Sequence, residues 1–244
     1  MPQRKSPARA DSIIAWIADT VHHRGLFGAI RSYAAGAANL LRDLTPQRRR
    51  SRYGDIDYDF DHGVDTSWAT VSLRTRMREL LAGAQYQASD PELFHEILQA
   101  LPVSPDGFTF IDLGSGKGRT LLMASDYAFR RIIGIELLDE LNQVAQRNIQ
   151  QYGSARQRCF NIESFMADAR GFEFPREPLV LYLFNPFPKY VLCSVLRNLQ
   201  LSFESSSRDL YVIYHKLIYE DVLRSQPWLT ELRRTHQFAV YKAG

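Results

Sequence analysis

The chain has 244 residues, of which 45% are hydrophobic and 23% charged. This composition is typical of a globular protein with a sizeable core and excludes a disordered or fibrous chain. The formal net charge is +3, but residues 1–50 hold nine Lys and Arg against three Asp, a net of +6, which leaves −3 for the remaining 194 residues. We therefore expect no strong nucleic-acid-binding face on the main domain.

The sequence also bears on location and on metal binding. No apolar segment followed by a small-residue cleavage site stands near the start, and no apolar run approaches the roughly 18 residues of a membrane span. Cys159 and Cys193 lie far apart, without ligand spacing to each other or to histidines. We expect a cytoplasmic protein with neither a disulfide nor a metal site.

Residues 1–52 are predicted to form a basic helical extension and a linker. An apolar periodicity typical of a helix runs from Ser12 to Leu44, and "PQRRRSR" (46–52) has the composition of an exposed linker. Three glycines indicate breaks in the helix: Gly25, Gly28 and Gly36. We expect this helix to pack on the sheet. The alternative is peripheral contact with an anionic membrane or with a protein partner.

Residues 53–84 are predicted to form a cap segment. Its first half, "YGDIDYDFDHGVDTSW" (53–68), is dense in Asp and aromatic residues. The acid spacing and the closing Glu of an EF-hand are absent, so a metal loop is not favoured. We expect a folded, solvated segment that lines an acceptor pocket.

From residue 85 onwards, strands alternate with helices. Asp90 precedes Pro91 and Glu92 and is predicted to cap a helix that runs to about Ala100. The predicted strands are 108–114, 131–136, 163–169, 179–186 and 209–215, the predicted helices are 118–129, 138–152 and 190–203, and a hairpin is predicted for 230–243. This alternation indicates a doubly wound α/β domain over residues 85–244, with ligands at the carboxyl ends of parallel strands.

The segment "FIDLGSGKGR" (110–119) carries the strongest functional signal. An apolar strand ends in Asp112, and glycines follow at 114, 116 and 118. Such a loop brings backbone N–H groups close to a ligand over a helix N-terminus. The spacing is neither G-x-G-x-x-G nor G-x-x-x-x-G-K-S/T, so it favours neither a dinucleotide site nor a P-loop. The alternative is a glycine-rich turn without a ligand.

Glu136 ends the second predicted strand, eighteen residues after Gly118. An acid at this point can accept hydrogen bonds from both hydroxyl groups of a ribose. Taken alone it could be a surface acid, and its register with the glycine loop favours the ribose role.

Asp112, Gly114, Ser115, Gly116 and Gly118, followed by Glu136, resemble the cofactor site of class I S-adenosylmethionine-dependent methyltransferases. The resemblance covers residues from Tyr86 to the C-terminus and implies a seven-stranded, mostly parallel Rossmann-like sheet that ends in an antiparallel hairpin. It also implies that S-adenosylmethionine is the cofactor.

Two further segments resemble this family. "MADA" (166–169) is similar to its third motif, which implies that Asp168 binds the adenine amino group and that Ala169 packs near the ring. "YQAS" (86–89) resembles a segment of a subgroup that includes several protein lysine methyltransferases, which implies that Tyr86 lies over the methionine part of the cofactor. The alternative for Tyr86 is a half-buried aromatic residue beside a helix cap.

The strand "LVLYLF" ends in Asn185, Pro186 and Phe187, with a second proline at 188. This resembles the N/D-P-P-Y/F motif of amino-group methyltransferases, although one proline is missing and Phe comes early. The resemblance implies that Asn185 contacts the cofactor and orients an amine next to it, and that the prolines stiffen the loop. It also implies that Phe187 stacks on the acceptor or covers the methyl group. The alternative is an Asn-Pro turn that only closes a strand. "FDHGVDTS" together with "FNPF" also resembles a bacterial subfamily of this class.

The sequence therefore predicts an S-adenosylmethionine-dependent methyltransferase that acts on nitrogen, with a protein lysine or another amine as the acceptor. One alternative is methyl transfer to oxygen or to a small metabolite, for which His215 is the best-placed base. The other is a cofactor-binding module without catalysis. The methyl acceptor, whether protein or small molecule, stays open at this point.

Overall fold

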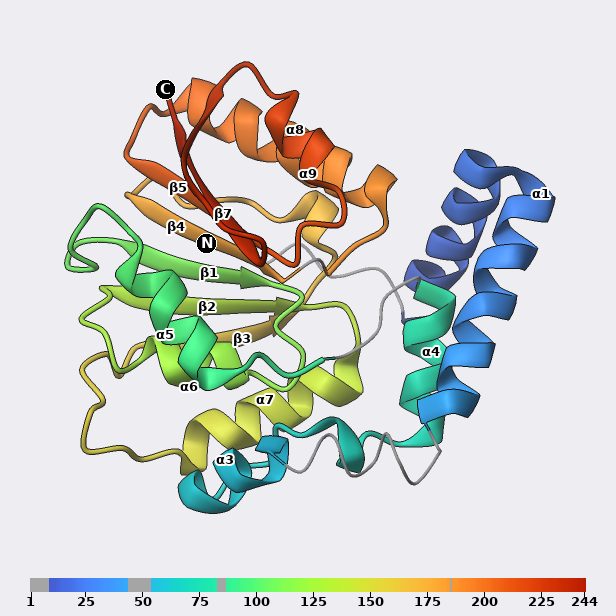
Figure 1. Ribbon diagram of the computed structural model, residues 1–244, viewed down its shortest axis with the longest axis horizontal. Helices are drawn as coiled ribbons and strands as arrows, with labels where there is room; N and C mark the ends of the chain where they lie inside the picture. The colour runs from blue at the N-terminus through green and yellow to red at the C-terminus, as the bar shows by residue number, and fades with distance from the viewer. Residues whose placement is uncertain (1–8, 44–53, 83–86, 185) are drawn as a thin grey trace.

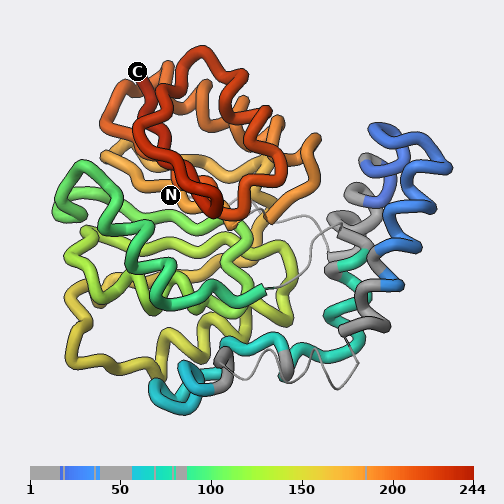
Figure 2. Tube along the Cα trace, in the orientation of Figure 1, coloured from blue at the N-terminus to red at the C-terminus, as the bar shows by residue number. Residues whose placement is uncertain are grey.

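The computed structural model describes residues 9–43, 54–82, 87–184 and 186–244 (Figures 1 and 2). The predicted linker at residues 46–52, together with Tyr86 and Asn185, lies outside these ranges.

One seven-stranded sheet forms the centre of the molecule (Figure 1). In chain order its strands are β1 (Thr109–Leu113), β2 (Arg131–Glu136), β3 (Ile162–Met166), β4 (Leu179–Phe184), β5 (Leu210–His215), β6 (Leu229–Arg234) and β7 (Phe238–Ala243). They are arranged in the order β3-β2-β1-β4-β5-β7-β6. The first five strands run parallel, and β7 is antiparallel to both β5 and β6. The predicted doubly wound sheet and its terminal hairpin are confirmed.

Helices cover both faces of the sheet. They are α5 (Pro91–Gln99), α6 (Arg119–Ala124), α7 (Asp139–Gln151), α8 (Lys189–Ser205) and α9 (Glu220–Arg224), with a short 3-10 helix, η2 (Ala169–Gly171), after β3. The helices α8 and α9 pack on one face, and α5 and α6 on the other. Asp90 caps α5 as expected, because its carboxylate accepts the Leu93 N–H at 2.9 Å.

The helix α6 ends at Ala124, five residues earlier than the sequence predicts. The Ser125 hydroxyl donates to the Leu122 carbonyl at 2.6 Å and so competes with continuation of the helix. The ring of Phe129, which is 3% exposed, belongs instead to the core under α5 and α6.

Because side chains along the buried strands alternate between the two faces of the sheet, each face has its own hydrophobic core. On β1, Ile111 and Leu113 face the α8 side, whereas Phe110 faces the α5 side. All five residues of β1 are buried, as is nearly all of β4, so both strands lie between helical layers. The chain reverses its direction of travel across the sheet between β1 and β4, and in α/β sheets ligands bind at the carboxyl ends of the strands beside such a switch point.

The N-terminal helix α1 (Arg9–Asp43) is a helical hairpin rather than one rod. Gly25 interrupts it with φ +67° and ψ 167°, so one of the three predicted breaks is confirmed. The hairpin packs on α4 (Leu73–Ala82) and stands to one side of the sheet (Figure 1). The expectation that this segment packs on the sheet is therefore wrong. Within the described residues, no helix is long and apolar enough to cross a membrane.

The hairpin touches the main domain at the first turn of α8. The Thr20 hydroxyl lies 3.1 Å from the Tyr190 hydroxyl, and the His23 ring stacks on the Tyr190 ring with centroids 4.8 Å apart. The N-terminal extension therefore lies beside the carboxyl ends of the parallel strands.

Candidate active site

The predicted site residues gather along one edge of the sheet. Because β3, β2, β1, β4 and β5 are parallel neighbours, their carboxyl ends lie side by side. In that order, the strand ends present Asp168, Glu136, the loop from Gly114 to Gly118, Pro186 and His215. Residues from five separate segments are thus brought together around the switch point.

The glycine loop adopts a conformation that only glycine adopts readily. The φ angles of Gly114, Gly116 and Gly118 are +84°, +55° and +86°, all in the left-handed region. A Cβ atom on Gly114 would lie 2.4 Å from the Cβ of Pro186. The loop after β1 and the loop after β4 are therefore in direct contact, and no larger residue fits between them.

Glu136 lies at the tip of β2, as predicted. One carboxylate oxygen accepts the Gly116 N–H at 2.9 Å, and the other accepts the Leu138 N–H at 2.8 Å. Each oxygen keeps a further lone pair with which it can accept a ribose hydroxyl. Burial raises the pKa of Glu136, and the backbone hydrogen bonds oppose that shift.

Asp112 lies behind the glycine loop rather than at its mouth. Its side chain is buried on the α6 face of β1, where the Thr120 hydroxyl donates to it. Burial raises the pKa of Asp112 to about 7, and the nearby charge of Glu136 adds to the effect. Asp112 thus joins the end of β1 to the first turn of α6 and supports the loop.

Ser115 also points inward. Its hydroxyl is buried and has no hydrogen-bond partner among the described residues. It lies against β2, because a Cβ atom on Gly134 would be 2.7 Å from it. The backbone of Ser115 donates to the Ile135 carbonyl at 3.1 Å and fastens the loop to β2. Buried hydroxyl groups without a partner are uncommon, and a polar ligand bound by this loop can supply the missing hydrogen bond.

Asp168 follows β3 and, in this structure, pairs with its neighbour Arg170. Its carboxylate accepts the Arg170 N–H at 2.9 Å and lies 2.7 Å from the guanidinium. Ala169 is 4% exposed and belongs to the core on the α8 face. Both residues lie at the expected edge of the sheet. The adenine contacts that the resemblance implies stay a prediction.

The loop after β4 is only partly described, and Asn185 and Tyr86 lie outside the described residues. Their expected roles stay predictions. Phe187 is 8% exposed and packs in the same core as Val191 and Leu192 of α8, so its ring anchors the loop to the core on the α8 face. Stacking of Phe187 on an acceptor, as the motif resemblance implies, has no support in this packing.

His215 lies at the end of β5, where it pairs in register with Phe184 at the end of β4. The two rings are stacked with centroids 4.0 Å apart and an interplanar angle of 4°. The imidazole Nδ1 lies 2.7 Å from the buried hydroxyl of Tyr182. Burial, together with the charge of Lys216, lowers the pKa of His215 to about 4, so the ring is neutral at pH 7.

Lys216, the next residue, is the one non-glycine residue with positive φ in the described part of the chain, at +63°. Such a conformation is uncommon and often occurs at functional sites. Its ammonium donates to Gln87 at 2.9 Å. Gln87, the second residue of the "YQAS" segment, therefore lies beside the end of β5.

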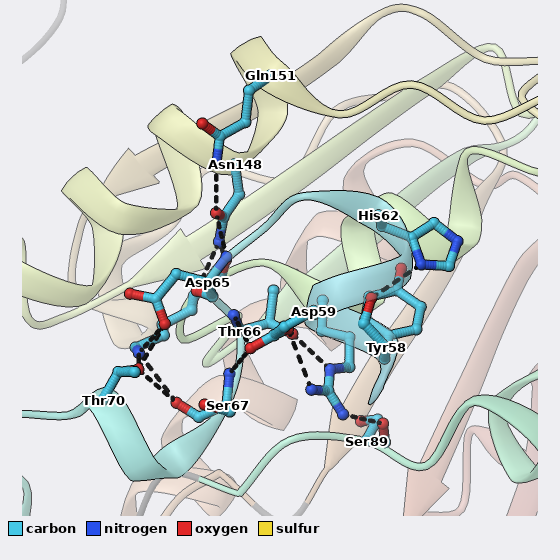
Figure 3. Close-up of polar contacts among 12 residues, drawn as sticks. Tyr58, Asp59, His62, Asp65, Thr66, Ser67, Thr70, Ser89, Asn148 and Gln151 are labelled. Carbon is cyan, nitrogen blue, oxygen red and sulfur yellow. Dashed lines mark hydrogen bonds and ion pairs between the residues drawn. The ribbon is translucent and has the colours of Figure 1, made fainter. Parts of the chain in front are cut away.

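The cap segment is bound to the glycine loop through Lys117. Figure 3 shows the cap residues of this contact, Asp65, Ser67 and Thr70. The Lys117 side chain is 2% exposed. Its ammonium donates to the Asp65 carboxylate at 2.8 Å, to the Ser67 carbonyl at 2.9 Å, and to the Thr70 hydroxyl. A residue of the glycine loop thus holds the turn that follows α3 (Gly54–His62).

Arg119 makes a second attachment, at the first residue of α6. It is also 2% exposed. Its Nε donates to the Thr66 hydroxyl at 2.6 Å, its guanidinium lies 3.4 Å from Asp59, and its Cζ lies 4.8 Å from the centroid of the Tyr58 ring. The Asp59 carboxylate in turn accepts the N–H groups of Thr66 and Ser67.

Asn148 of α7 makes a third attachment. We refer to the contacts of Lys117, Arg119 and Asn148 with the cap segment as the clamp. Its amide donates to the carbonyls of Asp65 and Lys117 at 2.8 and 2.9 Å, and its oxygen accepts the Asp65 N–H at 2.9 Å (Figure 3). The expectation of a solvated cap is therefore wrong for its central turn, where Thr66 and Ser67 are buried.

Sequence reasoning missed this clamp. The Asp-rich segment was interpreted on its own, although its carboxylates are complementary in charge to the Lys and Arg of "GKGR". That complementarity is the signal that could have revealed the contact.

A family comparison agrees with this geometry. Residues 80–173, less than half of the chain, match the family model described as "DOT1: Histone methylation protein DOT1". The matched range includes the glycine loop, Glu136 and Asp168 and ends before the loop at 185–188. No curated protein matches the sequence closely enough to be counted as a relative.

Solved structures with a similar fold include several methyltransferases. An RNA methyltransferase from Salinibacter ruber in complex with S-adenosylhomocysteine has 21% identity and a TM-score of 0.46, over 64% of this chain and 92% of that one. A SAM-dependent methyltransferase from Aquifex aeolicus has 15% identity and a TM-score of 0.44, over 64% and 98%. A dimethyladenosine transferase from Plasmodium falciparum has 12% identity and a TM-score of 0.47, over 65% and 62%. With TM-scores below 0.5, these likenesses carry no argument about this chain.

The expected enzyme class and cofactor are confirmed at this coarse level. The fold is a Rossmann-like methyltransferase fold, and the family match falls on the residues expected to bind the cofactor. The chain is an S-adenosylmethionine-dependent methyltransferase.

Proposed function

We propose that the chain transfers a methyl group from S-adenosylmethionine to a nitrogen atom of a protein, either a lysine side chain or a terminal amine. One observation carries the proposal. The loop after β4 touches the glycine loop after β1 so closely that a Cβ atom on Gly114 would lie 2.4 Å from Pro186. An acceptor held by the loop after β4 is therefore next to a cofactor held by the glycine loop.

The geometry of the carboxyl edge supports an assignment of the cofactor-binding residues. Glu136 offers carboxylate lone pairs to the ribose, the loop from Gly114 to Gly118 gives close backbone approach, and Asp168 lies at the neighbouring strand end for the adenine. When bound, S-adenosylmethionine supplies an electrophilic methyl group on a positively charged sulfur, which a nucleophile displaces in line.

The chain's own part in this reaction is to orient the acceptor and exclude water. An Asn side-chain oxygen at position 185 can accept a hydrogen bond from an amine and so direct its lone pair toward the methyl group. Transfer to the neutral amine gives a methylammonium cation, which releases its proton to solvent. The stacked rings of Phe184 and His215 lie beside this loop, at the ends of β4 and β5. The match to a histone methylation family supports a protein acceptor.

Label transfer from tritiated S-adenosylmethionine to a cell lysate tests the proposal. We expect label in the protein fraction that survives mild alkali, because N-methyl groups do and methyl esters do not. Addition of excess S-adenosylhomocysteine should suppress the transfer, and a Glu136→Ala variant should lack it. Label confined to nucleic acid or to small molecules would contradict a protein acceptor.

His215 favours a second candidate, methyl transfer to oxygen. Its ring is neutral at pH 7 and lies at the end of β5, beside the loop after β4 (residues 185–188). The Tyr182 hydroxyl holds the ring in place. A neutral imidazole can take a proton from a hydroxyl group during transfer. Mass spectrometry that places the methyl group on a hydroxyl oxygen, together with loss of turnover in a His215→Gln variant, would favour this alternative.

A further inference from the structure

The turn of the α1 hairpin carries an exposed apolar cluster. Leu26, Phe27 and Ile30 are 63%, 87% and 55% exposed. They stand directly after Gly25, where the two arms of the hairpin meet. We refer to residues 22–31 as the hairpin tip. Three large apolar side chains on one turn are more than the single exposed residues that ordinary surfaces carry.

The charge around this cluster is of one sign. Arg24 and Arg31 are both exposed and flank the apolar residues. The sequence from residue 20 to residue 42 contains no Asp or Glu. An apolar apex between cations is complementary to a surface that is apolar inside and anionic outside.

A side-chain hydrogen bond links the two arms of the hairpin at the tip. The guanidinium of Arg24 donates to the Ser32 hydroxyl at 2.8 Å and thereby joins the end of the first arm to the start of the second. The apolar side chains are thus presented at the convex end of a hairpin and not in a groove. A convex apex suits a deformable lipid surface better than it suits a folded protein, which would need a matching cavity.

We propose that the hairpin tip docks this protein on an anionic lipid surface. Leu26, Phe27 and Ile30 enter the boundary between head groups and acyl chains, while Arg24 and Arg31 contact the lipid phosphates. The docking we propose is peripheral and is made by the hairpin tip.

The position of the tip gives this docking a consequence for orientation. Thr20, in the arm that leads to the tip, and His23, at the start of the tip, contact Tyr190 in the first turn of α8. That helix begins directly after the loop at 185–188. Docking therefore brings the carboxyl edge of the sheet, with the glycine loop and the loop after β4, close to the lipid surface. The docking itself does not depend on the identity of the acceptor.

Co-sedimentation of the full chain with vesicles tests the proposal. We expect binding to vesicles of phosphatidylglycerol and phosphatidylcholine, weaker binding to phosphatidylcholine alone, and a loss of binding with added salt. A Phe27→Ser variant should bind at least about ten-fold more weakly, because burial of a Phe side chain accounts for a factor of that order. An Arg31→Gln variant should bind about five-fold more weakly and lose part of the salt dependence.

Phe160→Ser serves as the matched control. Phe160 is 78% exposed and lies just before β3, at the opposite edge of the sheet from the acceptor loop. Its variant should bind vesicles as the wild type does. Because Phe27 is exposed, the melting temperature of the Phe27→Ser variant should equal that of the wild type, which separates docking from folding.

Three results would overturn the proposal. The first is absence of wild-type binding to anionic vesicles, and the second is equal binding of the wild type and the Phe27→Ser variant. The third is a concentration-dependent dimer, seen by analytical ultracentrifugation, that Phe27→Ser abolishes in a protein that does not bind vesicles. That result would assign the tip to contact with a second copy of the chain.

Discussion

Replacement of Lys117 by Met tests the clamp between the cap segment and the glycine loop. The methionine keeps most of the apolar stem and removes the ammonium group, which donates to Asp65, Ser67 and Thr70. It leaves the Ser67 carbonyl, in a buried residue, without this donor. We expect the segment of residues 54–72 to detach more often from the domain.

The structure sets the size of this effect. A hydrogen bond from a charged group contributes about 1.5–3 kcal/mol, whereas the Ser67 carbonyl keeps a hydrogen bond from the Thr70 hydroxyl at 3.1 Å and is not left unsatisfied. The Asp65 side chain is 44% exposed, so water screens its part of the interaction. The expected loss is about 2–4 kcal/mol in the free energy of opening, which corresponds to amide exchange roughly 30- to 1,000-fold faster.

Hydrogen exchange followed by mass spectrometry measures that opening segment by segment. Peptides from residues 54–72 should lose protection in the Lys117→Met variant, while peptides from β4 and α8 should not. Lys189→Met is the matched control, because Lys189 pairs with Asp221 on the surface at 2.5 Å. Unchanged protection of the cap in the Lys117→Met variant would refute the reasoning.

Three further substitutions probe the site. Gly114→Ala should reduce cofactor affinity at least about ten-fold, measured by calorimetry, because its methyl group overlaps Pro186; unaltered affinity would mean that the two loops are further apart. Asn185→Ala should leave the dissociation constant of the cofactor within a few-fold and lower single-turnover methylation by about a hundred-fold; full activity would reduce Asn185 to a turn residue. His215 has a pKa lowered from 6.5 to about 4 by burial and by Lys216, so folding loses stability as the pH falls through this window. His215→Gln removes that loss. In denaturant titrations, the free energy of unfolding of the variant should rise by up to about 3 kcal/mol relative to the wild type between pH 7 and pH 4.5. An equal pH dependence of the two proteins would show that the His215 ring is solvated.

The sequence predicted the sheet because its signals are local. A strand such as Leu179–Phe184 is apolar throughout, and such runs between helical patterns indicate parallel strands buried on both faces. The glycine spacing likewise depends on backbone geometry within a few residues, and the left-handed φ angles of Gly114, Gly116 and Gly118 agree with it.

What the sequence did not predict depends on contacts between distant segments. Lys117 and Asp65 are 52 positions apart, and nothing in the pattern around either residue shows that they meet. The arm of α1 that contacts Tyr190 is separated from it by about 170 positions. Phe187 was assigned a functional role from its motif, but packing against α8 placed it in the core.

Binding of S-adenosylhomocysteine to the carboxyl edge of the sheet is the central claim, and isothermal titration calorimetry measures it directly. The wild type should bind this ligand and should bind NAD much more weakly. The Glu136→Ala variant should bind S-adenosylhomocysteine about ten- to a hundred-fold more weakly, because it lacks the carboxylate that accepts the ribose hydroxyls. Tighter binding of NAD, or an unchanged dissociation constant in a folded Glu136→Ala variant, would contradict the account.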